Sequence, residues 1–224
     1  MPSNTKLDQR EIDLVVKFLN KKKFQDAKFK INDLIKKYPN VFFLYNLLGI
    51  IFSEEKNINK AIIQFKKAIQ LNPNNPEAYN NLGIAFFKIK EYENAKYNYK
   101  KAISLKPQFF EAYNNLGVVY RKELNFNEAT SAYNKSIELN PKFLDPYINL
   151  GNIFNEYGKF NDAKKKFLKA IELSPNYSKA YLGLGKSLKN LGNLEQATES
   201  YKKAIQLESN NNLEVTLKNN KDKL

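Results

Sequence analysis

Residues 76–109 read PEAYNNLGIAFFKIKEYENAKYNYKKAISLKPQF. The first half places apolar and small residues at the spacing of one helix face: Tyr79, Leu82, Gly83 and Phe86. The second half starts a new face at Tyr92 and closes at Pro107, through which a helix cannot continue. Asn75 stands before Pro76 where a helix N-cap is expected. The stretch therefore predicts a hairpin of two helices.

The same pattern returns along the chain with a constant step of 34 residues. A proline closes each unit: Pro39, Pro73, Pro107, Pro141 and Pro175. Five units also carry a leucine–glycine pair: Leu48-Gly49, Leu82-Gly83, Leu116-Gly117, Leu150-Gly151 and Leu184-Gly185. Small residues let two helices approach closely while large aromatic side chains fill the space beside them. One hairpin cannot bury both of its faces, so we expect stability to come from the stacking of neighbouring units.

The unit reads Tyr-x-x-Leu-Gly-x-x-Phe/Tyr, then Ala-x-x-x-Tyr/Phe-x-x-Ala, then Pro, and it resembles the tetratricopeptide repeat. The resemblance implies an all-α fold, a right-handed superhelical α-solenoid of helix-turn-helix repeats. Five repeats match the pattern: 42–75, 76–109, 110–143, 144–177 and 178–211. A sixth, at 8–41, is degenerate because Glu11 and Val15 replace its tyrosine and its glycine.

The two ends of the chain depart from this period. We expect residues 1–7 to form a flexible N-terminus. Ser209 stands where the last unit would have its proline, and Leu213 and Leu217 follow at helical spacing. Residues 212–224 therefore have two interpretations, a short polar tail or a partial capping helix over the last unit. An uncovered last unit would favour self-association through the C-terminal edge.

The composition argues against catalysis. The chain has no cysteine and no histidine, which removes the usual soft metal ligands and the usual general base near neutral pH. It has no glycine-rich phosphate loop and no nucleophile elbow. We therefore predict no catalytic residues, no cofactor and no metal site. No apolar stretch approaches the ~20 residues of a membrane span and the N-terminus lacks a signal-peptide core, so we expect a cytoplasmic protein.

The chain is strongly basic, with a formal net charge of +14. Several lysine pairs share one position on the second helix of their units and are expected on the convex surface: Lys66-Lys67, Lys100-Lys101 and Lys202-Lys203. One interpretation is a surface for a polyanion such as nucleic acid, or for an acidic membrane. The other is that these are solvated lysines whose aliphatic stems cover the helix surface. We favour the second interpretation over the first. Arg10 and Arg121 are the only arginines, and nucleic-acid readers depend on arginine forks.

The resemblance places a binding groove on the concave face, which the first helix of each repeat lines. The fifth and sixth residues of the units give two sets of candidate groove residues: Asn46, Asn80 and Asn114, and then Asn81, Asn115 and Asn149. The ninth and twelfth residues add a third set: Ile50, Ile84, Val118, Asn152, Lys186, Phe87, Arg121 and Lys189. The early part of this groove is apolar and amide-rich, and its late part is basic. A bound segment with apolar anchors and an acidic end suits that gradient.

Asparagine carries a donor and an acceptor on one short side chain, so a row of asparagines can bind a peptide backbone. The row Asn81, Asn115 and Asn149 is similar to that of the substrate-recruiting domain of O-linked N-acetylglucosamine transferases, and this resemblance implies peptide binding. The alternative is a structural role, since asparagine is common at this position of the repeat and in this chain.

These features together predict a non-catalytic adaptor or scaffold that binds a protein or peptide partner. Two alternatives remain at this stage. One is an accessory substrate-recruiting module of a glycosyl- or sulfotransferase system. The other is a polyanion-binding or nucleic-acid-binding protein that uses the convex lysines.

Overall fold

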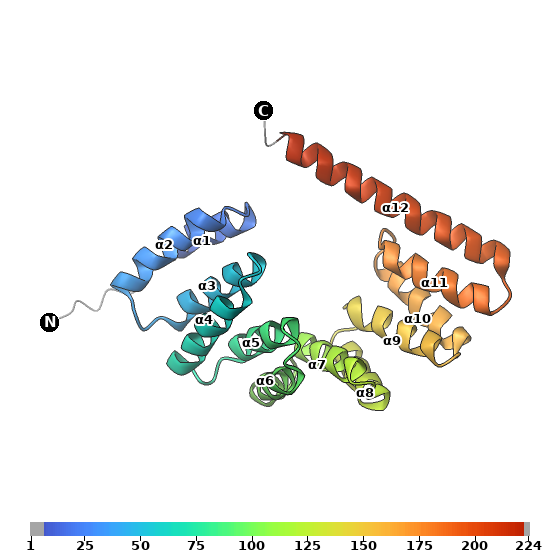
Figure 1. The fold of residues 1–224 in the computed structure, drawn as a ribbon, viewed down its shortest axis with the longest axis horizontal. Helices are drawn as coiled ribbons and strands as arrows, with labels where there is room; N and C mark the ends of the chain where they lie inside the picture. Colours follow the sequence, from blue (N-terminus) through green and yellow to red (C-terminus); the bar gives the residue numbers. More distant parts are fainter. Residues whose placement is uncertain (1–6, 222–224) are drawn as a thin grey trace. The chain divides into compact units, whose positions relative to one another are not determined.

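The computed structural model describes residues 7–221, with side chains described for residues 7–209. Residues 7–221 form twelve helices and no strand. The helices are α1 (Gln9–Asn20), α2 (Phe24–Lys37), α3 (Phe42–Glu54), α4 (Ile58–Leu71), α5 (Pro76–Lys88), α6 (Tyr92–Leu105), α7 (Phe110–Lys122), α8 (Phe126–Leu139), α9 (Asp145–Glu156), α10 (Phe160–Leu173), α11 (Ser178–Asn190) and α12 (Leu194–Lys221). They follow one another as hairpins (Figure 1). The expected all-α helical repeat fold is confirmed.

The chain forms two compact units, residues 1–112 and 113–224, with the boundary inside α7. In the first unit α3 packs against α4 and α5 against α6, while α4 also packs against α5 of the next hairpin. In the second unit α9 packs against α10 and α11 against α12, while α10 also packs against α11. Each compact unit therefore buries one hairpin against its neighbour.

Local signals in the sequence explain where the helices begin. Asn75 is the N-cap of α5, because its Oδ1 accepts the backbone N–H of Ala78 (2.7 Å). Pro76 occupies the first turn, where its missing N–H costs nothing. The helix start predicted at this point is confirmed.

The two helices of a hairpin meet at a glycine on the first helix and an aromatic ring on the second. A Cβ atom added to Gly83 would lie 2.6 Å from the Tyr99 ring, and one added to Gly117 would lie 2.7 Å from the Tyr133 ring. Real Cβ atoms do not come this close to other atoms, so a side chain here would force the helices apart. The leucine–glycine pairs of the sequence therefore mark the contact that closes each hairpin.

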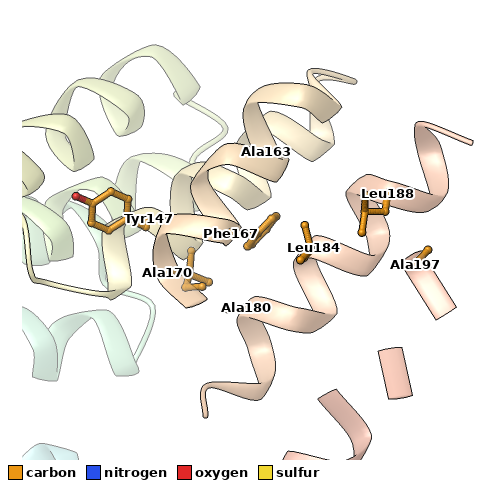
Figure 2. Packing of buried hydrophobic residues seen from close by; sticks show 9 residues of the cluster. Tyr147, Ala163, Phe167, Ala170, Ala180, Leu184, Leu188 and Ala197 are labelled. Carbon is orange, nitrogen blue, oxygen red and sulfur yellow. The ribbon is translucent and has the colours of Figure 1, made fainter. Parts of the chain in front are cut away.

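In the second unit Phe167 of α10 is fully buried within one apolar cluster. Figure 2 shows its ring beside Leu184 of α11. The ring also lies against two glycines, Gly151 of α9 and Gly183 of α11, and neither could carry a Cβ atom unless the ring moved. One large ring between two bare stretches of backbone thus brings three helices together.

The turn inside every hairpin contains one residue with a left-handed backbone. These residues keep the 34-residue step: Lys22, Lys56, Lys90, Leu124, Gly158 and Gly192. Their φ angles lie between 54° and 81°, a region that glycine enters without steric cost. A residue with a Cβ atom loses roughly 1–2 kcal/mol there. Four of these turns therefore carry local strain that the last two avoid.

α12 is 28 residues long, whereas α4, α6, α8 and α10 each have 14. The preceding units end their second helix before a proline, and Ser209 does not stop α12 at the corresponding point. The sequence predicts either a polar tail or a partial capping helix for residues 212–224. The backbone of residues 212–221 continues α12. The side chains of this segment, and the expected flexible residues 1–6, lie outside the described residues.

We predict that Lys90→Gly raises the free energy of unfolding by about 0.5–1 kcal/mol, because relief of the left-handed strain exceeds the added freedom of the unfolded chain. Gly192→Ala should lower it by about 1 kcal/mol through backbone strain alone, since nothing lies within 4 Å of the added Cβ atom. Urea denaturation followed by circular dichroism measures both changes. Lys101→Gly, inside α6, is the control and should destabilise by about 1 kcal/mol. A loss of stability with Lys90→Gly equal to that of the control would contradict the strain at this turn.

Candidate protein-binding surface

In the first unit, polar side chains connect the first helices of successive hairpins. Asn81 of α5 donates its Nδ2 to Oδ1 of Asn46 on α3 (3.2 Å). Farther along the same helices, Lys88 Nζ donates to Ser53 Oγ (2.8 Å). Both bonds join residues 35 positions apart, one unit and one residue. The face of the first helices is thus held by polar contacts as well as by apolar packing.

The second unit repeats this arrangement between α7 and α9. Asn149 donates its Nδ2 to Oδ1 of Asn114 (3.1 Å), again 35 residues earlier. Arg121 of α7 forms an ion pair with Glu156 of α9 at the same step. The predicted groove residue Arg121 therefore has a carboxylate partner within its own unit.

Between α9 and α11 the asparagine pair is replaced by Ile148 and Gly183. The polar contact lies farther along the helices, at Asn155, which is buried. Its Nδ2 donates to the carbonyl of Gly183 (3.3 Å), and its Oδ1 accepts from Ser187 Oγ (2.9 Å). These hydrogen bonds are thus inside the protein, and the fifth and sixth positions at this junction contribute no polar side chain.

The predicted groove residues at the fifth position do not lie on an open surface. Asn46, Asn80 and Asn114 expose 8%, 7% and 5% of their surface. Asn46 and Asn114 accept the hydrogen bonds described above. Their burial corrects the expectation that this position lines a groove: these amides hold the stack together. Adjacent Asn-Asn pairs in the sequence indicate this structural role, because position five of one unit contacts position six of the next.

The asparagine row predicted at the sixth position is partly accessible. Asn81, Asn115 and Asn149 are half-buried. A primary amide has two N–H donors and one oxygen acceptor, and the bonds from Asn81 and Asn149 to their neighbours each use one donor. These side chains therefore contribute to the stack whether or not they contact a ligand, and their role as ligand contacts stays a prediction.

Three hollows lie along the first helices and bring other predicted residues together. The α3–α5 hollow has a volume of about 130 Å³ and is lined by residues that include Ile50, Ser53, Asn81, Ile84 and Lys88. The α7–α9 hollow measures about 360 Å³ and includes Val118, Arg121, Tyr133, Asn149 and Glu156. The α9–α11 hollow measures about 520 Å³ and includes Ile148, Asn152, Lys179, Leu182, Lys186 and Tyr201.

Besides the buried fifth-position asparagines, three predicted residues do not line these hollows: Asn115, Phe87 and Lys189. The ring of Phe87 packs at a tilt against Tyr92, with centroids 5.6 Å apart. Lys189 is exposed near the end of α11. The predicted twelfth-position residues are therefore not gathered at one place.

The α9–α11 hollow differs from the other two in its charge. Lys179 and Lys186 are exposed and lie seven residues apart on α11, which puts them on the same side of the helix. The residues lining this hollow include no aspartate or glutamate, whereas Glu54 and Glu156 line the other two. This hollow therefore combines two lysines, with no acidic residue in its own lining, and an apolar wall.

The apolar wall of the α9–α11 hollow consists of Ile148, Leu182 and Tyr201. Leu182 is 56% exposed, although it occupies the fifth position that is buried in Asn46 and Asn114. Ile148, Leu182 and Tyr201 were not among the groove residues predicted from the sequence. The replacement of asparagine by Ile148 and Leu182 at the fifth position of the last two units is the signal that points to these two residues.

Tyr133 of α8 places a buried phenol at the α7–α9 hollow. Burial raises the pKa of Tyr133 above its ordinary value, so the phenol stays protonated near neutral pH. Its Oη has no hydrogen-bond partner among the described residues. Buried hydroxyl groups normally have such a partner. An oxygen acceptor bound in this hollow would supply one.

Two properties of the described residues concern other kinds of site. No helix within residues 7–221 has both the length and the apolar character that crossing a bilayer requires. In the same part of the chain, aspartate and glutamate side chains form no group of three or more that could hold a metal ion.

Models of repeat families match consecutive parts of the chain. A model described as TPR repeat matches residues 49–90 and 85–123. Two models described as tetratricopeptide repeat match residues 110–143 and 132–165. A model described as regulator of microtubule dynamics protein 1-3 matches residues 151–224. No curated protein gives a significant match.

Several solved structures are similar to the chain. The crystal structure of MamA protein is 26% identical and has a TM-score of 0.64, over 76% of this chain and 93% of that one. PilW, described as a widely conserved type IV pilus biogenesis factor, is 22% identical with a TM-score of 0.78, over 86% and 91%. YrrB, described as a TPR protein with an unusual peptide-binding site, is 21% identical with a TM-score of 0.60, over 84% and 97%. The likeness to PilW and YrrB shows the fold alone.

We predict that Asn149→Ala lowers the free energy of unfolding by about 1–2 kcal/mol, because it leaves the buried Oδ1 of Asn114 without its donor. Asn152→Ala, on the same helix and half-buried in the α9–α11 hollow, is the matched control and should change stability by less than about 0.5 kcal/mol. Thermal denaturation of the two variants measures the difference. Equal stability of both would show that the asparagine pair does not hold the stack.

Proposed function

Because the chain is a tetratricopeptide repeat protein, we propose that it is a non-catalytic adaptor that binds a peptide segment or a helix of a partner protein. Repeats of this family generally form protein-interaction folds. In this proposal the first helices supply the face for binding. A solved structure with the same fold, YrrB, is described as having a peptide-binding site. The observation that carries the proposal is the α9–α11 hollow, with its apolar wall and its two lysines.

The apolar wall favours an anchor residue of the partner. A large apolar side chain that enters the hollow would cover Leu182, which is 56% exposed, and the Tyr201 ring. Removing apolar surface from water contributes about 25 cal/mol per Å². A hollow of about 520 Å³ has room for a leucine or phenylalanine side chain together with part of its backbone.

The lysines select the residues that flank this anchor. Lys179 and Lys186 stand on one side of α11, and no acidic residue lines the hollow beside them. A carboxylate of the partner next to its apolar anchor would pair with one of these ammonium groups. The bound segment is therefore apolar at its anchor and acidic within one or two turns of it.

The α7–α9 hollow would contact the backbone of the same partner or of a second segment. Tyr133 offers an unused O–H donor, and Asn149 retains one N–H donor and its oxygen beyond the bond to Asn114. A peptide carbonyl is the acceptor that suits the Tyr133 hydroxyl. Such contacts depend little on the side chains of the partner, so the α9–α11 hollow carries the selectivity.

The chemistry of the available side chains supports binding without catalysis. The chain has neither histidine nor cysteine. Burial raises the pKa of the Tyr99 and Tyr133 phenols, so even less of either side chain is present near neutral pH as the phenolate that could act as a base or nucleophile.

We predict that peptides selected on the intact chain from a random display library carry an apolar residue followed closely by aspartate or glutamate. Lys179→Glu combined with Lys186→Glu should weaken such a peptide by about tenfold or more, measured by fluorescence anisotropy, because attraction becomes repulsion. The same peptide with its acidic residues changed to amides should lose much less from this change.

Lys202→Glu with Lys203→Glu is the matched control, because both lysines are exposed on α12 and the net charge changes equally. Equal weakening by the two double variants would mean that net charge alone attracts the peptide, and the proposal for the α9–α11 hollow would fail.

A second copy of the chain is the partner that we propose for the C-terminal edge. A hollow of about 370 Å³ lies between α11 and α12, and its lining includes Ala204, Ile205 and Glu208. It shares Lys179, Leu182 and Tyr201 with the α9–α11 hollow, so a second copy bound here would compete with the peptide. Ile205 is 66% exposed, whereas Ile171, at the same position one unit earlier, packs against an apolar cluster. The last unit therefore presents an apolar surface of the kind that earlier units cover with the next hairpin.

We predict that the mass measured by sedimentation equilibrium rises with the concentration of the intact chain, and that Ile205→Lys keeps the chain monomeric. A lysine would place a charge in the apolar contact between copies. Leu168→Lys, at another exposed apolar residue on α10, is the control and should self-associate like the unaltered chain. A chain that stays monomeric at high concentration would contradict this interface.

A further inference from the structure

Three exposed apolar side chains form a regular row on the second helices of the first unit. Phe29 of α2, Ile63 of α4 and Tyr97 of α6 expose 72%, 61% and 66% of their surface. They are spaced 34 residues apart and so occupy the same place on three consecutive hairpins. We call these three residues the outer row.

The outer row points away from the packed side of its helices. Each member follows by two residues the buried alanine of its unit: Ala27, Ala61 and Ala95. Each also precedes by two residues a buried core side chain: Ile31, Phe65 and Tyr99. Two residues correspond to about 200° around a helix, so the outer row lies on the face opposite to the core.

The fold itself does not require apolar residues at this place. The corresponding residues of the second unit are exposed and polar: Ser131, Lys165 and Glu199. Single exposed apolar residues are ordinary on protein surfaces. Three exposed apolar residues at the same position of consecutive hairpins form a regular pattern, and such a pattern indicates a binding surface.

Lysines lie beside the outer row on α4 and α6. α4 contains three lysines and no acidic residue, and α6 contains three lysines and one glutamate. The four lysines of α2 are in ion pairs with Glu11, Asp33 and Glu55, so the positive charge lies mainly beside Ile63 and Tyr97. The pairs Lys66-Lys67 and Lys100-Lys101 follow Ile63 and Tyr97 by three and four residues, so they lie on neighbouring parts of the same helix surface.

The acidic residues near the outer row are largely offset within their own helices. Glu93 pairs with Lys96 (2.7 Å), and Asp33 pairs with Lys36 (3.5 Å). The remaining charge around Ile63 and Tyr97 is therefore positive. A partner that complements this surface has negative charge and accepts isolated apolar side chains.

We propose that the outer row docks the protein on an anionic membrane surface. Phe29, Ile63 and Tyr97 enter the interfacial region of the bilayer, and the neighbouring lysines contact the phosphates and carboxylates of the lipid headgroups. Tyr97 is favoured at this depth because its ring is apolar and carries a polar hydroxyl group. The contact uses the second helices, so it is separate from the binding proposed for the first helices.

A membrane suits these residues better than a protein surface does. The centre of a protein interface is a continuous apolar patch depleted of charge. In the outer row each apolar side chain comes from a different helix and has lysines beside it. A lipid surface deforms around single inserted side chains and offers negative charge between them.

The absence of tryptophan from the chain allows a direct test. The full-length variants Phe29→Trp and Tyr97→Trp each have one tryptophan, whose emission shifts to shorter wavelength when it enters a bilayer. We expect this shift with phosphatidylcholine vesicles that contain phosphatidylserine, and little with phosphatidylcholine alone. Tyr157→Trp, at an exposed tyrosine of the second unit, should not respond and serves as the control.

Vesicle sedimentation tests the same proposal without a reporter. The triple variant Phe29→Ser, Ile63→Ser, Tyr97→Ser should bind phosphatidylserine vesicles about tenfold or more weakly than the unaltered chain. The triple variant Tyr157→Ser, Leu168→Ser, Leu194→Ser removes as many exposed apolar side chains outside the outer row and should bind normally. Circular dichroism verifies that both variants are folded.

Two outcomes would overturn the proposal. The first is equal binding of the unaltered chain and the outer-row variant, or no binding of either, to phosphatidylserine vesicles. The second is salt-sensitive binding to duplex RNA together with a silent Tyr97→Trp variant, which would assign the lysines to nucleic acid.

Discussion

The contact between a glycine and an aromatic ring is the constraint on which this structure depends. Without a Cβ atom at Gly83 or Gly117, the ring of the second helix can rest directly on the backbone of the first. That distance decides how the hairpin closes and, through rings such as Phe167 that lie on two glycines, how the next hairpin stacks. The polar contacts between first helices follow from this spacing, because short amide side chains meet only when the helices are near each other. Any replacement of these glycines would therefore disturb the binding face as well as the core.

The first helices of successive units contact each other in two different ways, and both shape the binding face. Where asparagines occupy positions five and six, as in Asn114 and Asn149, the first helices are tied together and the surface between them is amide-rich. Where Ile148 and Gly183 occupy these positions, the hydrogen bond between the helices is instead made by the buried Asn155, and the hollow between them is larger. The contrast explains how nearly identical units produce a surface with one distinctive place. A repeat protein gains selectivity where its period is broken.

The fold was predictable from the sequence because its signals are local and repeated. Pro107, Gly83 and the Asn75 cap each act within a few residues, and the 34-residue step multiplies them. The candidate site was less predictable because it depends on contacts between units. Asn80 and Asn81 are neighbours in sequence with identical chemistry, yet one is buried and the other half-buried. Their difference comes from helix stacking, which the composition of one unit does not reveal. The sequence also did not predict where α12 ends. Ser209 replaces the proline that would stop the helix, and no other residue nearby marks a helix end.

The 35-residue hydrogen bond has a consequence for how such a chain changes over generations. Its acceptor lies at the fifth position of one unit and its donor at the sixth position of the next. Units 76–109 and 110–143 have asparagine at both positions, so unequal recombination that duplicates one of these units would again place a donor opposite an acceptor. Such arrays can therefore change in length without passing through an unstable intermediate. Ile148 cannot accept this hydrogen bond and Gly183 has no side chain to donate it. The units that contain them could therefore not be exchanged freely with the others.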